Sequence, residues 1–184
     1  MAFSIETRKQ IGQGYSAIRG FFRQYELIYT VAEERDVVRL RTNYRTGEEV
    51  FLYHMKASPG RSRAVFLEYI KRVNELHERP EWYNALTSNC TTNIYTEVAK
   101  ANGHQQGPLV LLRHLPLNGK DDEKAYERGA IAGDDLPFQE LQAHALINPA
   151  AKAADQASDF SALIRKGRPG FESSVNSSGS ASSN

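Results

Sequence analysis

The sequence predicts an α+β fold in which an antiparallel β-meander packs against two main helices. Short segments rich in β-branched and aromatic residues come first, and two longer segments with helical periodicity follow them. Of the 184 residues, 40% are hydrophobic, which is enough to bury a core without disulfides. We expect a single domain over residues 1–170 and a disordered, Ser-rich tail over residues 171–184.

Four strands are expected in the first third of the chain. Ala2–Thr7 is short and partly alternating, and Gln24–Ala32 is rich in aromatic and β-branched residues. Val37–Arg45 alternates between apolar and polar residues, and Glu49–Lys56 follows after the turn "TGE". Short turns between the last three strands predict an antiparallel meander.

Two amphipathic helices are expected next. Ser58 is a favourable N-cap for a helix over Pro59–His77, in which apolar residues recur at three- and four-residue spacing. Asn89 is a favourable N-cap for a second helix over Cys90–Ala101, and Gly103 is placed to end it. Beyond it the chain is loop-rich, with short helical pieces expected over residues 109–114 and 137–145.

Composition excludes several classes of protein. Lys and Arg number 23 and Asp and Glu number 22, so the net charge of +1 argues against a general nucleic-acid or membrane binder. One cysteine excludes an internal disulfide and any multi-cysteine metal site. We expect no metal and no cofactor. The sequence has no apolar run long enough for a transmembrane helix and no apolar leader at its start.

Cys90, in "ALTSNCTTNIYTEVAK", is the candidate nucleophile. A helix N-terminus stabilises a thiolate through its dipole and its unpaired N–H groups, which also suit an oxyanion. Asn89, Thr91 and Thr92 are the expected supporting residues. In the alternative interpretation, Cys90 shares one helix face with Ile94 and is a small core residue.

A polar pocket is a weaker prediction. Its candidate members are polar or charged residues on or near the expected strands, and His54 could face the Cys90 helix. A solvated sheet face with structural ion pairs explains the same residues. The candidates are Arg23, Glu26, Arg41, Asn43 and His54.

Several long blocks, among them "GYSAIRGFFRQYELIYTVAEERDVVRLRTNYR" and "ASPGRSRAVFLEYIKRVNELHERPEWYNALTSNCTTNI", resemble the bacterial Lnb N-terminal periplasmic domain family. The resemblance extends from about Ser4 to Ile164, and the family's Asn-Cys-Thr motif matches Asn89, Cys90 and Thr91. It implies a permuted papain-like fold of the NlpC type and a periplasmic or membrane-associated location. It also implies a cell-envelope cysteine hydrolase or acyltransferase that acts on an amide or ester.

The chain departs from this family in one respect. Family members carry a histidine before the strand at "SIETRK", whereas this chain has none before His54. We therefore expect the N-terminal part of the family domain, and with it the histidine base, to be missing. The expected partners are an envelope peptide or lipid ester, no nucleic acid, and a second copy joined through an open sheet edge. The alternative function is a non-catalytic binding or scaffold domain, or an inactive remnant.

Overall fold

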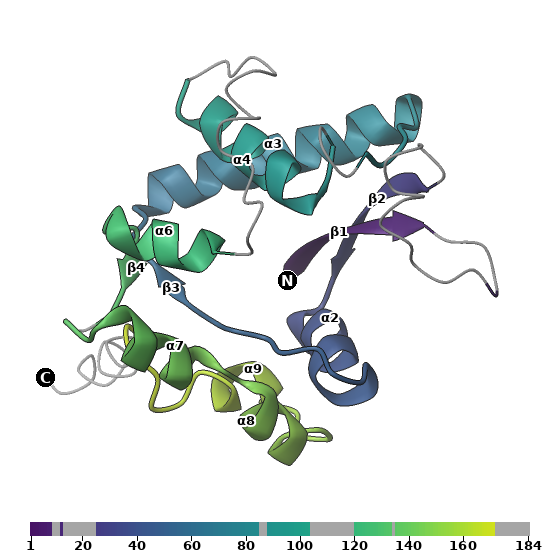
Figure 1. Cartoon of the computed structure of the whole chain (residues 1–184). Coiled ribbons are helices and arrows are strands. Elements are labelled where there is room, and N and C mark those ends of the chain that lie inside the picture. Colours follow the sequence, from purple (N-terminus) through teal and green to yellow (C-terminus); the bar gives the residue numbers. More distant parts are fainter. Residues whose placement is uncertain (9–11, 13–24, 85–87, 104–119, 134, 172–184) are drawn as a thin grey trace, which may run out of the picture. The chain divides into compact units, whose positions relative to one another are not determined.

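The computed structural model describes residues 1–8, 12, 25–84, 88–103, 120–133 and 135–171 (Figure 1). The chain forms two compact units. Unit 1 consists of Met1–Val31 and Ala57–Gly119, and unit 2 consists of Ala32–Lys56 and Lys120–Asn184. Helices and small paired strands together confirm the predicted α+β class. The single domain over residues 1–170 stays a prediction, and residues 172–184 of the expected tail lie outside the described residues.

Unit 1 contains a small sheet. Strand β1 (Ala2–Arg8) pairs with β2 (Glu26–Ala32), and both strands lie where the first two strands were predicted. Residues 81–83 run along β2 as well, where the N–H of Leu27 donates to the carbonyl oxygen of Glu81 at 2.9 Å. The sequence pattern did not indicate this third extended segment.

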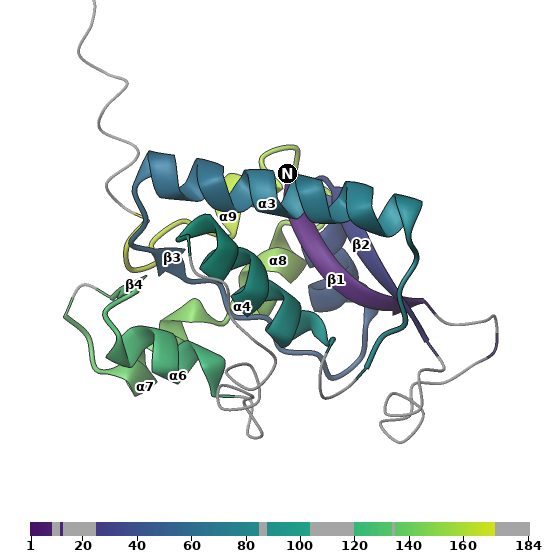
Figure 2. The same cartoon turned by 90° about the horizontal axis from the view of Figure 1, so that it is seen from above.

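The two predicted main helices are confirmed in unit 1. Helix α3 (Pro59–Glu78) begins after Ser58, whose hydroxyl accepts a hydrogen bond from the N–H of Arg61 at 3.3 Å. Helix α4 (Cys90–Ala101) packs alongside α3, as Figures 1 and 2 both show. The apolar side of α3 faces the sheet, where the Phe3 and Tyr69 rings lie 5.2 Å apart.

The predicted strand over Val37–Arg45 is wrong. These residues form helix α2 (Glu34–Arg39) and the π-helix η1 (Leu40–Tyr44) in unit 2. Val38 packs on the core and Thr42, one turn later, is buried, whereas Leu40 and Tyr44 are exposed. Burial thus follows the helical spacing of four residues rather than the strand spacing of two.

The predicted meander is also wrong. Within residues 49–56 the strand is only β3 (His54–Met55), which pairs with β4 (Ile131–Ala132). Earlier in the same segment, Phe51 forms an antiparallel bridge with Leu146. The pairing partners are therefore distant in sequence, and local strand propensity carries no information about them.

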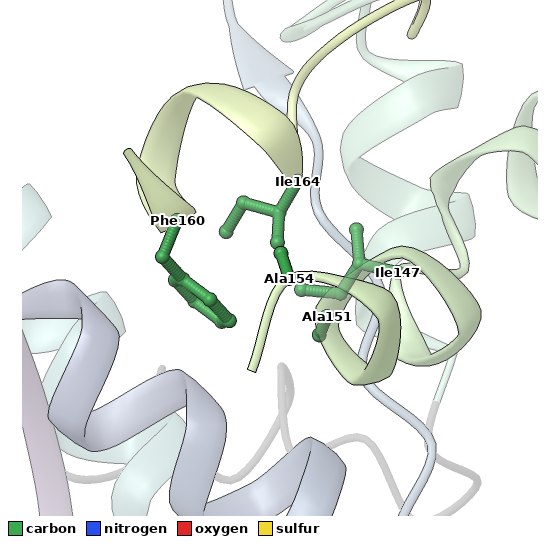
Figure 3. Close-up of a cluster of buried hydrophobic side chains, with 5 residues drawn as sticks. All are labelled: Ile147, Ala151, Ala154, Phe160 and Ile164. Carbon is green, nitrogen blue, oxygen red and sulfur yellow. The ribbon is translucent and has the colours of Figure 1, made fainter. Parts of the chain in front are cut away.

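Unit 2 has a helical core. It draws on α7 (Phe138–Ala145), α8 (Asn148–Ala153) and α9 (Phe160–Leu163), with α6 (Asp121–Glu127) packed against β4. The helical piece predicted at 137–145 is confirmed, and the piece predicted at 109–114 lies outside the described residues. Figure 3 shows the buried cluster, which consists of Ile147, Ala151, Ala154, Phe160 and Ile164.

Candidate functional site: an exposed cysteine at a helix start

Cys90 is the first residue of α4, and it is a free, exposed cysteine. A thiol in this position meets the positive end of the helix dipole, which favours negative charge on sulfur. Its sulfur lies 4.0 Å from the hydroxyl oxygen of Thr91. The structure thus places the thiol where both solvent and a carbonyl compound can reach it.

The start of α4 is fixed by a reciprocal capping box between Asn89 and Thr92. The Asn89 side-chain oxygen accepts from the Thr92 N–H at 2.8 Å, and the Thr92 hydroxyl oxygen accepts from the Asn89 N–H at 2.9 Å. Asn93 adds a third contact, because its amide donates to the Asn89 carbonyl oxygen at 2.8 Å. These hydrogen bonds therefore fix the backbone conformation at Cys90.

Two backbone N–H groups remain for an incoming oxyanion. Within the described part of the chain, the N–H groups of Cys90 and Thr91 have no protein acceptor, as expected for the first turn of a helix. The N–H of Thr92 is already bound to Asn89. Thr91 thus remains a candidate oxyanion donor, whereas Thr92 supports the site by closing the cap.

Cys90 is not a core residue, so that part of the alternative interpretation is wrong. Ile94, one turn further along the same face of α4, is 45% exposed. The buried residues of the helix are instead mostly polar, with Thr92, Asn93 and Glu97 each less than 9% exposed beside the apolar Ala99. A polar side can be buried here because these groups find partners in the cap and in Lys100.

The first two members of the predicted polar pocket do not contribute to a described site. Arg23 lies outside the described residues. Glu26 lies on β2 in unit 1, where its side chain is half-exposed and forms an ion pair with Arg8 at 3.3 Å. This exposed ion pair is what the solvated-face interpretation predicts.

The next two members bind separate partners in unit 2. The Arg41 guanidinium donates to Glu48 at 2.5 Å. The Asn43 amide donates to the Asp155 carboxylate at 2.7 Å and to the Ala151 carbonyl oxygen at 3.2 Å. Both residues join η1 to neighbouring parts of unit 2 through these different partners.

His54 is also engaged within unit 2. Its ring stacks on Phe171 with centroids 5.1 Å apart, and its Nδ1 contacts the carbonyl oxygen of Gly170. The one described histidine of unit 1 is His77, in the last turn of α3, and it is exposed. No hydrogen bond joins Cys90 to a histidine within the described residues.

Two residues near the site were missed by the sequence reasoning. Asn93 stands four residues after the cap, and that spacing is the signal that could have identified it as a second contact to Asn89. Glu97 stands two turns after Cys90 and is 1% exposed. Burial raises the pKa of Glu97, the nearby Lys100 and Arg72 lower it, and Glu68 raises it, with a net increase. An isolated acid on a helix gives no sequence signal of such burial.

Neither a metal cluster nor a membrane span emerges from the residues that the structure describes. No group of three or more His, Cys, Asp or Glu side chains among them could hold a metal ion. No described helix is long and apolar enough to cross a bilayer.

The fold and the site define an α+β protein with a solvent-accessible cysteine at a capped helix N-terminus. The family model of the Lnb N-terminal periplasmic domain matches residues 1–117, and the chain belongs to that family. The match includes β1, β2, α3 and the Asn-Cys-Thr motif of α4, and the family description places such domains in the periplasm. Comparisons with curated proteins and with solved structures found no match.

Proposed function

We propose that this domain is a cell-envelope cysteine hydrolase or acyltransferase with Cys90 as its nucleophile. The observation that carries the proposal is the exposed thiol at the capped start of α4, beside two unbound N–H groups. A permuted papain-like arrangement of the NlpC type belongs to the same proposal. Such enzymes also place a cysteine at a helix start, although the order of the parts along the chain varies among them.

The reaction would proceed by acyl transfer. The Cys90 thiolate attacks the carbonyl carbon of an amide or ester, a C–S bond forms, and the N–H groups of Cys90 and Thr91 bind the oxyanion. The C–N or C–O bond then breaks, and the leaving group takes the proton that the general base accepted from the Cys90 thiol. Water or an acceptor nucleophile finally cleaves the thioester and regenerates the thiol.

The general base comes from outside the described residues around Cys90. His77 is exposed at the end of α3, and His54 is bound within unit 2. As the family resemblance implies, the proposal assigns this role to a histidine outside the residues that the structure describes around Cys90. The substrate would be an envelope peptide or a lipid ester, because both present a carbonyl to a periplasmic thiol.

Acylation of the intact protein tests the proposal. Full-length chain is incubated with a p-nitrophenyl ester, and the added mass is mapped to a residue. We expect folded protein to acylate at Cys90 at least tenfold faster than denatured protein at pH 7. Cys90→Ser should abolish the adduct and change the free energy of unfolding by less than about 0.5 kcal/mol, because the side chain is exposed.

A relocated thiol provides the matched control. The double variant Cys90→Ser with Thr91→Cys keeps one cysteine in the first turn but moves it from the candidate position. We expect it to acylate at the rate of denatured protein. Equal rates for the two thiol positions, or equal rates for folded and denatured wild type, would contradict the proposal.

A non-catalytic binding domain is the second candidate. The observation that favours it is the absence of a histidine bound to Cys90 among the described residues. In this case Cys90→Ser would leave binding to peptidoglycan fragments or lipid vesicles unchanged, and no acyl adduct would form. Self-association through the sheet edge would appear as a concentration-dependent mass in sedimentation equilibrium.

A further inference from the structure

Asn93 is a buried polar residue of α4 whose side chain contacts the backbone just before Cys90. The residue is 7% exposed. Its side-chain amide donates to the Asn89 carbonyl oxygen at 2.8 Å and to the Ser88 hydroxyl oxygen at 3.3 Å. The two acceptors precede Cys90 by one and two residues. Asn93 can therefore act on the candidate site through hydrogen bonds, without touching the thiol itself.

The Asn89 carbonyl oxygen accepts hydrogen bonds from three donors. Besides the Asn93 amide, the Asn93 backbone N–H donates to it at 3.1 Å and the Thr92 hydroxyl donates to it at 3.1 Å. The backbone bond is the ordinary first bond of an α-helix, whereas the two side-chain bonds are additional. Because a carbonyl oxygen has two lone pairs, three donors restrict its direction closely.

This carbonyl belongs to the same peptide group as the Cys90 N–H. The peptide group is planar and trans, so its C=O and N–H bonds point in opposite directions. Donors that fix the Asn89 oxygen therefore also fix the direction of the Cys90 N–H, which is one of the two oxyanion donors proposed above. Hydrogen bonds to the oxygen also polarise the amide, and each strengthens the N–H as a donor by about 10–30%.

The contact with Ser88 connects this peptide group to the sheet of unit 1. The Ser88 N–H donates to the Asn84 carbonyl oxygen at 2.9 Å, and the Asn84 N–H donates to the Ser88 carbonyl oxygen at 3.2 Å. Residues 81–83, which precede Asn84, run along β2. Asn93 thus binds a segment that the sheet holds in place, as well as a carbonyl of its own helix.

We propose that Asn93 is a positioning residue for the oxyanion site at Cys90. It fixes and polarises the Asn89–Cys90 peptide group, so that the Cys90 N–H is directed at the substrate's carbonyl oxygen. That oxygen takes up the electron pair of the C=O double bond when the thiolate forms the C–S bond. The role rests on the function proposed above, and it assigns to Asn93 an effect on acyl transfer in addition to its structural contacts.

Two reactions of the same thiol distinguish positioning from a structural role. Acylation by p-nitrophenyl acetate passes through a tetrahedral oxyanion, whereas alkylation by iodoacetamide displaces iodide and forms no oxyanion. A variant that changes the exposure of Cys90 or its thiolate fraction changes both rates alike. A variant that misdirects the oxyanion donor slows acylation alone.

The test variant is Asn93→Leu in the full-length chain, because leucine has about the size of asparagine but donates no hydrogen bond. Loss of a direct oxyanion donor costs about 10²–10³-fold, and Asn93 acts through a donor that remains, so we expect acylation at pH 7 to slow about fivefold. The rate of alkylation should stay within about twofold of wild type, since the thiol is exposed at the same helix start.

Asn102→Leu is the matched control. The Asn102 amide also donates to a carbonyl oxygen four residues earlier, that of Val98 at 2.7 Å, but at the other end of α4. We expect its ratio of acylation rate to alkylation rate to equal that of wild type. An unchanged ratio in Asn93→Leu would overturn the proposal, and so would an equal fall in the two variants.

The backbone amide of Cys90 gives a second readout that does not require acylation. Hydrogen bonds to the Asn89 oxygen draw electron density from the Cys90 nitrogen, so Asn93→Leu should move the Cys90 ¹⁵N resonance upfield in a ¹H–¹⁵N spectrum. Asn102→Leu should leave it in place. If folded wild type acylates no faster than denatured protein, the proposed function fails, whereas this spectrum still tests Asn93, and an unmoved resonance overturns its effect on the peptide group.

Asn93→Ala serves as a second variant should Asn93→Leu not fold. It removes the same donor and places no branched side chain in a buried position. We expect the same selective loss of acylation and the same upfield shift at Cys90. Acylation and alkylation that fall by the same factor would show that Asn93 stabilises α4 without positioning the oxyanion donor.

Discussion

Asn89 fixes the backbone of the candidate site through a single side chain. Its oxygen binds the Thr92 N–H, and its own N–H is bound by the Thr92 hydroxyl. Asn89→Ala should lower the free energy of unfolding by about 1 kcal/mol, the usual cost of losing an N-cap. Urea denaturation measures this difference. Asn89→Asp should retain most of the stability, because aspartate caps equally well.

The control for this prediction is Asn74→Ala on the exposed side of α3. That change removes no cap and improves helix propensity, so it should be neutral or slightly stabilising. An equal loss at positions 74 and 89 would show that the cap contributes nothing.

Gly170, in unit 2, occupies a position where any side chain would be strained. Its φ is +78°, and an added Cβ would lie 2.7 Å from the Cβ of Ala132 and 3.1 Å from that of His54. Gly170→Ala should therefore destabilise unit 2 by about 2–4 kcal/mol, from the left-handed backbone and the overlap together. Thermal unfolding followed by circular dichroism measures the loss.

A substitution at Gly167 separates the cost of the left-handed backbone from the cost of the overlap. Its φ is +67°, but an added Cβ would meet nothing within 4 Å. Gly167→Ala should cost only about 1–2 kcal/mol, from the backbone alone. If Gly170→Ala and Gly167→Ala lower the free energy of unfolding equally, the overlap with Ala132 and His54 does not contribute to the loss.

At the scale of elements, the Arg72–Glu81 pair connects α3 with the segment that lies along β2. The two hydrogen bonds from Arg72 lower the pKa of Glu81 although burial opposes them. The resulting stability is present above the ordinary Glu pKa of 4.5 and is lost as pH falls through the folded value. In Glu81→Gln, the free energy of unfolding of unit 1 should decrease less steeply as the pH falls than it does in wild type.

Urea titrations at pH 3, 4, 5 and 7 check this prediction. The difference between wild type and Glu81→Gln should shrink as pH decreases. Glu75→Gln is the control, because its contact with Arg72 is longer, at 3.6 Å. A constant difference at all four pH values would mean that the pair does not stabilise the unit.

The elements that the sequence predicted correctly are those specified by local signals. Ser58, Pro59 and Asn89 mark helix starts through their own backbone contacts, and the structure places α3 and α4 where these residues indicate. The capped cysteine was predictable for the same reason. Its exposure was not, because the apolar spacing of Cys90 and Ile94 suggested burial, whereas the residues that the helix buries are mostly polar.

The failed strand over residues 37–45 shows the limit of local signals. Alternating residues favoured a strand, but Asn43 and Arg39 bind groups in α8 and after it, more than 100 residues away. These contacts stabilise α2 and η1 only once the C-terminal half is present. Tertiary contacts of this kind override intrinsic propensity and leave no trace in a short window.

At the scale of the whole molecule, the division into two units predicts that a destabilising mutation in one unit unfolds that unit and leaves the other folded. Phe160 is 1% exposed in the core of unit 2, and Phe160→Ala should cost about 3–5 kcal/mol. Hydrogen exchange should show lost protection in α7, α8 and α9 while α3 and α4 stay protected. Equal loss in both groups of helices would instead indicate one cooperative domain, as the sequence alone predicts.

Unit 2 is assembled from two stretches of chain that leave the ribosome at different times. Glu48 accepts a hydrogen bond from Asn148, 100 residues later, and Val50 and Leu52 pack on the same late core. At about 5–20 residues per second, residues 32–56 wait on the order of 5–20 s for these partners. All residues of unit 1 precede residue 120, so this unit is synthesised first. During this interval, residues 32–56 expose apolar side chains whose partners in unit 2 have not yet been synthesised. This is when chaperones would be most needed.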